Sequence, residues 1–205
     1  MNNHVSSKII HIFICLSLFI TFGICWIVYL NHTIPASVTL KDYPSFEGHL
    51  EYAFTHIGNL TPDTSLPPTD VSDSVNNLYT ISGNGAQGDI LSIDGYAYIP
   101  GQDIELFNTV VLLQAAGSDT TDPVLSPRTF STPSSSVTDS FGDGEFNYNF
   151  ASFKSVIPKK YLTKGIKYHI WLLYGNNEYP KSVFKTTYTV LINDLNEVEV
   201  TNANA

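Results

Sequence analysis

The amino-acid sequence predicts an all-β sandwich of about seven strands, preceded by one N-terminal transmembrane helix. Residues 9–30 form a long apolar run, whereas residues 76–193 contain short apolar, aromatic and β-branched runs separated by Gly, Asn, Asp, Pro and Ser. No segment after residue 30 shows a sustained helical period. A chain of 205 residues has room for one such domain and a short additional segment.

The predicted membrane anchor, residues 9–30, contains no Asp, Glu, Lys or Arg. As a helix it would extend about 33 Å, which matches the hydrocarbon core of a bilayer. Lys8 and the α-amino group precede it, so the positive-inside rule places residues 1–8 in the cytoplasm. The lipid bilayer is therefore an expected partner, with the remaining chain outside the plasma membrane. The competing interpretation is a signal peptide that is cleaved near Ala36.

Residues 31–75 are rich in Pro, Thr, Ser and Asp and are predicted to form a stalk. Within it, residues 43–57 carry scattered apolar side chains, which leaves packing on the module, a helical turn and a strand as open alternatives. The β module is predicted at residues 76–193, and residues 194–205 are predicted to be a C-terminal tail.

The predicted strands follow from alternation and from turn-forming residues between them. Seven strands in this length are typical of a sandwich. They are Leu78–Ser82, Ile90–Ile99, Glu105–Ala115, Arg128–Thr132, Phe146–Val156, Gly165–Tyr174 and Phe184–Ile192.

The clearest strand places Ile166, Tyr168, Ile170, Leu172 and Tyr174 on one face by period-two alternation. Residues 162–170 read Leu-x-x-Gly-x-x-Tyr-x-Ile, which resembles the tyrosine corner of fibronectin type III and other immunoglobulin-like sandwiches. The resemblance implies that the Tyr168 hydroxyl ties the incoming loop to the strand.

A second resemblance concerns Ile93–Ile99 followed by Val110–Leu113. This pattern is similar to the opening of β-sandwich modules in Gram-positive cell-envelope proteins, with Tyr96 at a position where such modules are expected to carry Trp. The only cysteines, Cys15 and Cys25, lie in the apolar run, so no disulfide can form within the predicted module. A cysteine-free exported domain also favours a bacterial origin.

The formal net charge is −9, which disfavours nucleic acid as a partner because carboxylates repel phosphates. The charges are also segregated. Residues 42–145 contain fifteen acidic residues and one basic residue, Arg128, whereas residues 146–185 contain seven lysines and one acidic residue, Glu178. This segregation of charge could steer a charged partner towards the protein. The alternative is that the charged side chains only keep the surface solvated.

Oxygen ligands suited to calcium cluster in residues 139–147, where Asp139, Asp143 and Glu145 accompany two glycines. A second acidic turn, at Asp119 and Asp122, could contribute further oxygens. The spacing is not that of an EF-hand, and acidic turn residues without a metal are the alternative. No cofactor is expected.

Evidence for catalysis is absent from the sequence: no Gly-x-Ser-x-Gly or zinc-binding motif occurs, and the predicted module has one histidine, His169. Tyr148, Tyr174 and Tyr179 are candidates for carbohydrate-stacking platforms or, alternatively, for core packing. We therefore expect a non-catalytic binding or accessory module that recognises an envelope protein or glycan. The alternative is an extracytoplasmic hydrolase or transferase acting on envelope glycan.

Overall fold

The computed structural model describes residues 17, 20–23, 35–60, 87–104, 106, 108–175 and 181–203. The chain divides into two compact units, residues 1–34 and residues 35–205. In the first unit, Ser17 and residues 20–23 are helical, while the rest of the predicted anchor lies outside the described residues. No helix within the described ranges is long and apolar enough to cross a membrane. The anchor at residues 9–30 therefore stays a prediction.

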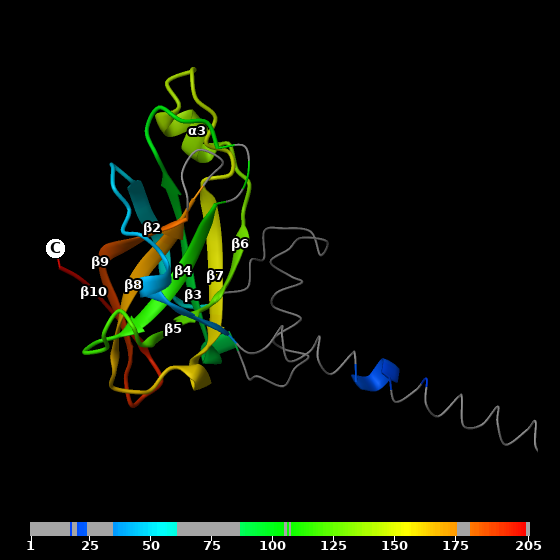
Figure 1. Cartoon of the computed structure of the whole chain (residues 1–205), viewed down its shortest axis with the longest axis vertical. Coiled ribbons are helices and arrows are strands. Elements are labelled where there is room, and N and C mark those ends of the chain that lie inside the picture. Colours follow the sequence, from blue (N-terminus) through cyan, green and yellow to red (C-terminus); the bar gives the residue numbers. More distant parts are fainter. Residues whose placement is uncertain are drawn as a thin grey trace, which may run out of the picture. The chain divides into compact units, whose positions relative to one another are not determined.

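The second unit consists of two antiparallel sheets, which confirms the predicted all-β sandwich (Figure 1). The six-stranded sheet has the order β1-β5-β4-β8-β9-β10 and the four-stranded sheet the order β2-β3-β7-β6. The strands are β1 (Ala36–Thr39), β2 (Glu51–Asn59), β3 (Ile90–Tyr98), β4 (Thr109–Ala115), β5 (Pro123–Ser126), β6 (Arg128–Ser131), β7 (Ser152–Pro158), β8 (Lys167–Tyr174), β9 (Ser182–Ile192) and β10 (Val198–Asn202). The helical elements are η1 (Leu40–Asp42), η2 (Gln87–Asp89), α3 (Ser136–Phe141) and η3 (Lys159–Tyr161).

The core lies between the two sheets and is built by alternation along each strand. From β8, Tyr168, Ile170, Leu172 and Tyr174 point into it, and none is more than 6% exposed. The four-stranded sheet contributes buried residues of β3 and β7, including Leu91, Ile93, Phe153 and Ile157. Ile166, which the alternation predicted on the same face, precedes β8 and is 39% exposed.

The surroundings of Tyr168 are those that the sequence predicts. The Tyr168 side chain is 6% exposed, and its hydroxyl accepts a hydrogen bond of 2.9 Å from the backbone N–H of Thr163. Thr163 belongs to the loop that leads into β8, so the bond ties this loop to the strand. The predicted burial and backbone bond of Tyr168 are confirmed.

A second apolar cluster covers the outer face of the six-stranded sheet. Leu112 and Leu173 alternate with core-facing residues and thus point outward, where they pack with Leu40, Val124 and Val183. Residues 38–46, hereafter the strap, supply this cover. The strap begins in β1, which pairs with β5, and ends where the backbone of residues 44–46 exchanges two hydrogen bonds of 2.9 Å with Val183.

Strands β1 and β2 correct the stalk predicted for residues 31–75, because residues 36–39 and 51–59 belong to the two sheets. The tail predicted at residues 194–205 is also wrong in part, since β10 pairs with β9 over residues 198–202. Composition misled the prediction in both places. Short strands among polar residues are stabilised by neighbours distant in sequence, which a local pattern does not reveal.

Other boundaries also differ from the predictions. The described strand β4 begins at Thr109 rather than at Glu105, and β7 begins at Ser152 rather than at Phe146. Strand β5 and helix α3 were not predicted, and the predicted strand Leu78–Ser82 lies outside the described residues. Aromatic residues 146–150 caused the largest error, because they pack against other loops instead of extending β7.

Candidate functional site

Three segments meet at the end of the sandwich that carries α3, at the top of Figure 1. They are residues 45–51 before and at the start of β2, residues 99–108 between β3 and β4, and residues 132–151 between β6 and β7. We call their described residues the loop end. Functional residues are often found on loops that a rigid scaffold holds in place.

Hydrogen bonds join two of these loops. The backbone N–H of Ile104 donates to the carbonyl of Asn147 at 2.8 Å, and the N–H of Asn147 donates to the Asp103 carboxylate at 2.6 Å. The Tyr148 hydroxyl, which is buried, accepts a bond of 2.9 Å from the N–H of Gly101. The loops therefore form one hydrogen-bonded frame.

Helix α3 is held to this frame through the Thr138 hydroxyl. This group accepts a hydrogen bond from the Tyr148 N–H and donates one to the Asn149 side-chain oxygen, both at 2.7 Å. After α3 the chain turns sharply at Gly142, where a Cβ atom would lie 2.4 Å from the Phe146 carbonyl oxygen and 2.7 Å from that of Thr138. Only glycine fits this turn without displacing backbone.

Five aromatic rings form a continuous series on this frame, which we call the aromatic stack: Tyr96, Phe141, Tyr98, Tyr148 and Phe146. The Tyr98 and Tyr148 ring centroids lie 4.4 Å apart, and Phe141 stacks on Tyr98 at 5.7 Å and 27°. Tyr96 lies 5.8 Å from Phe141. Tyr98 and Tyr148 are buried, whereas Phe141 is 44% exposed and Tyr96 half-buried. The inner rings of the stack are thus buried, and its outer rings expose aromatic surface to solvent.

Carboxylates flank the stack. Glu51 is the direct cross-strand neighbour of Tyr98, and its side chain contacts His49 at 2.6 Å. Burial raises the pKa of Tyr98, and the negative charges of Glu51 and Asp143 raise it further. The carboxylates of Glu51 and Asp143 thus act on the buried base of the stack.

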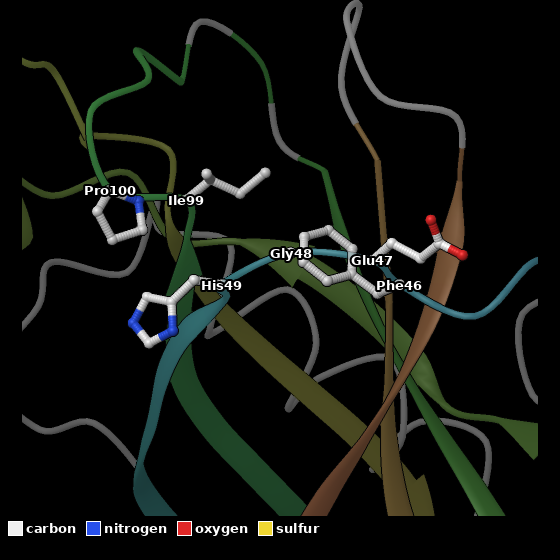
Figure 2. A pocket seen from close by; sticks show the side chains of 6 residues that line it. All are labelled: Phe46, Glu47, Gly48, His49, Ile99 and Pro100. Carbon is white, nitrogen blue, oxygen red and sulfur yellow. The ribbon is translucent and has the colours of Figure 1, made fainter.

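A small hollow lies beside the stack and has a volume of about 160 Å³. Figure 2 shows the side chains that line it, which come from the segment before β2 and from the residues that follow β3. They are Phe46, Glu47, Gly48, His49, Ile99 and Pro100.

Behind the hollow, the Tyr174 ring packs edge-on against Phe46, with centroids 6.0 Å apart. The Tyr174 hydroxyl is buried and makes no hydrogen bond of normal geometry in the described part of the chain. Burial raises the pKa of Tyr174 to about 12, although the Ile99 backbone and the Asn108 side chain oppose the rise. Tyr174 is consequently a neutral core residue at physiological pH.

The structure assigns Tyr148 and Tyr174 to the core, since each is 1% exposed. Of the two interpretations left open by the sequence, core packing is confirmed for these residues, and neither is a carbohydrate platform. Tyr179 lies outside the described residues. His169 is half-buried in β8, where burial and then the charge of Lys185 lower its pKa.

The calcium candidates are spread over α3 and the turn that follows it. Asp139 accepts a hydrogen bond of 2.9 Å from the Ser135 hydroxyl within the helix, whereas Asp143 and Glu145 lie in the exposed turn. At the opposite end of the sandwich, Asp122 accepts a bond from the backbone N–H of Asp119. Among the residues that the structure describes, no group of three or more His, Cys, Asp or Glu side chains is arranged to hold a metal ion.

Two members of the stack that reach solvent, the half-buried Tyr96 and the exposed Phe141, were missed as binding residues. Tyr96 and Tyr98 alternate with core residues of β3, and this outward-facing aromatic pair was a usable signal. The sequence offers no comparable signal for Phe141, because the exposure of this side chain depends on α3.

In comparisons with known proteins, no family model matches the chain, and no curated protein or solved structure shows significant similarity to it.

Proposed function

We propose that this chain is a membrane-anchored, extracytoplasmic module that binds a protein or glycan of the cell envelope without catalysing a reaction. The observation that carries the proposal is the aromatic stack, in which Phe141 is 44% exposed above the buried rings of Tyr98 and Tyr148. Exposed aromatic surface on a preorganised frame is typical of recognition sites, because little conformational entropy is lost on binding.

The proposal includes an immunoglobulin-like fold. In support, the order β2-β3-β7-β6 corresponds to strands A-B-E-D of such sandwiches, and β5-β4-β8-β9 corresponds to C′-C-F-G. Tyr168 then occupies the tyrosine-corner position at the start of strand F. In this correspondence the loop end contains the B–C loop, one of the loops that bind antigen in variable domains.

The membrane anchor is supported by the apolar run of residues 9–30 and by Lys8 before it. Protease treatment of intact cells tests the orientation. A C-terminal tag should be removed while a cytosolic control protein survives. Protection of the tag would place the module inside the cell, and release of a chain that lacks its first 30–36 residues would show that the segment is a cleaved signal.

Site-specific crosslinking tests the binding surface. A photoreactive phenylalanine analogue in place of Phe141 should crosslink an envelope component in intact cells. The same analogue at Leu195, which is 79% exposed in the turn between β9 and β10, serves as the control and should not. Equal crosslinking at both positions would contradict the assigned surface, and turnover of purified envelope glycan by the chain would contradict a non-catalytic role.

A further inference from the structure

We infer that the aromatic stack and its flanking carboxylates form a docking surface for a positively charged polypeptide segment. The inference rests on the proposed function and specifies the partner of the same site. It follows from two independent properties of the described loop end, the accessible rings and the sign of the charges around them.

The rings supply an attractive surface for cations. The faces of Phe and Tyr rings carry partial negative charge, and an ammonium or guanidinium group within about 6 Å of a ring centroid is attracted to it. Phe141 is exposed and Tyr96 is half-buried, and their centroids lie 5.8 Å apart, so one extended side chain can contact both rings. Lys and Arg also cover apolar surface with their methylene stems, whereas an inorganic cation cannot.

The charges point to the same class of partner. Residues 99–108 and 132–151 contain five carboxylates and no Lys or Arg: Asp103, Glu105, Asp139, Asp143 and Glu145. Asp103 and Asp139 already accept hydrogen bonds within the frame. Asp143 is exposed and makes no hydrogen bond within the described structure, and its negative charge acts on Tyr98, so it is available to a ligand.

Glu51, the cross-strand neighbour of Tyr98, supplies a second carboxylate and also contacts His49. A cationic side chain over the rings would therefore be attracted by two carboxylates. An anionic polymer would be repelled, and a neutral glycan would gain stacking but nothing from the charges. Charge complementarity thus favours a Lys- or Arg-containing peptide segment.

Titration calorimetry with the full-length chain in a nonionic detergent tests this inference, with a peptide of ten lysines as the probe. The double variant Glu51→Gln/Asp143→Asn should weaken binding at least tenfold. The control variant Asp119→Asn/Asp194→Asn removes two exposed carboxylates at the opposite end of the sandwich and should change binding less than twofold. Phe141→Leu keeps the apolar volume but loses the ring and should weaken binding about threefold.

The three variants replace exposed side chains, and thermal unfolding should show that each remains folded. Equal weakening by both double variants would mean diffuse attraction to an acidic protein and would overturn the inference, as would no binding of the lysine peptide at low salt. Preferential binding of a neutral chitin hexasaccharide, lost in Phe141→Leu, would also overturn it while leaving the proposed binding function intact. That function fails separately if crosslinking from position 141 captures no envelope component.

Discussion

The hydroxyl of Tyr168 makes one hydrogen bond in an otherwise apolar setting, so its contribution can be separated from that of the ring. Tyr168→Phe removes the bond and should lower the free energy of unfolding by about 0.5–1.5 kcal/mol. Tyr168→Ala also removes the buried ring and should cost about 3–5 kcal/mol. Denaturant unfolding of residues 35–205 would measure both. Wild-type midpoints for both variants would contradict the tyrosine-corner assignment.

Asp94 gives stability a pH dependence. Burial raises its pKa above 3.8, despite a hydrogen bond from the Ser92 hydroxyl and the nearby charges of Lys154 and His56. A raised pKa means that ionising Asp94 costs more free energy in the folded state than in the unfolded state. The contribution of Asp94 to stability is therefore fully present below its unfolded pKa and is lost as pH rises through its folded pKa.

Asp94→Asn should therefore increase stability relative to the wild type at pH 7 more than at pH 3. Urea unfolding of both proteins at the two pH values tests this expectation. The same difference in the free energy of unfolding at both pH values would show that Asp94 titrates alike in the folded and unfolded chains.

The strap is an element whose contribution depends on one side chain. Leu40 is 2% exposed among Leu112, Val124, Leu173 and Val183. Leu40→Ala should therefore lower the free energy of unfolding by about 2–5 kcal/mol through lost burial and a new cavity. Leu195→Ala removes the same atoms from a side chain that is 79% exposed and should change stability by less than about 0.5 kcal/mol. Similar effects of the two substitutions would mean that the strap does not cover the sheet in solution.

The turn after α3 offers a second test at the level of an element. A methyl group at Gly142 would meet two backbone oxygens, so Gly142→Ala should cost about 1–3 kcal/mol and displace Phe141 from Tyr98. Gly88→Ala is the matched control, because nothing lies within 4 Å of its Cβ position. Calorimetric unfolding and near-ultraviolet circular dichroism would report the two effects. An unchanged aromatic signal in Gly142→Ala would argue against a rigid stack.

Elements with strong internal alternation were the ones that the sequence predicted well. β3 and β8 lie inside their sheets, and the residues that they contribute to the main core cluster lie at alternate positions. β1, β2 and β10 lie at sheet edges, contain no fully buried residue and depend on pairing with a neighbouring strand. Their sequences therefore resemble a linker or a tail. Edge strands of this kind cannot be predicted from the local sequence alone, because tertiary contacts stabilise them.

The candidate site includes a segment that the sequence singled out for different chemistry. Residues 139–147 were singled out for their carboxylates, and this segment does lie at the loop end, where Asp143 acts on Tyr98. What the sequence could not provide was Phe141 stacked on Tyr98, because that contact joins residues 43 positions apart through a helix of six residues. Helices this short have little periodicity to detect.

At the scale of the whole molecule, the segregated charges of the sequence fall on different loops of the second unit. The loops 99–108 and 132–151 carry only acidic charges, whereas residues 159–167, between β7 and the start of β8 at the opposite end, carry Lys159, Lys160, Lys164 and Lys167. Lys159 is buried, which lowers its pKa, and it donates a hydrogen bond to the Asn196 carbonyl. Asp119, Asp122 and Asp194 lie at the same end as these lysines, so the charges there are mixed.

The strap also determines how the sandwich would respond to mechanical load. If residues 9–30 hold the chain in a membrane, as proposed, tension enters the module at Pro35 and first meets the four-residue pairing of β1 with β5. Leu40 and the backbone bonds to Val183 come next in series, and the central core bears the load only after them. Under force, β1 and the strap would detach first and lengthen the tether, while loops 99–108 and 132–151 keep their hydrogen bonds to each other.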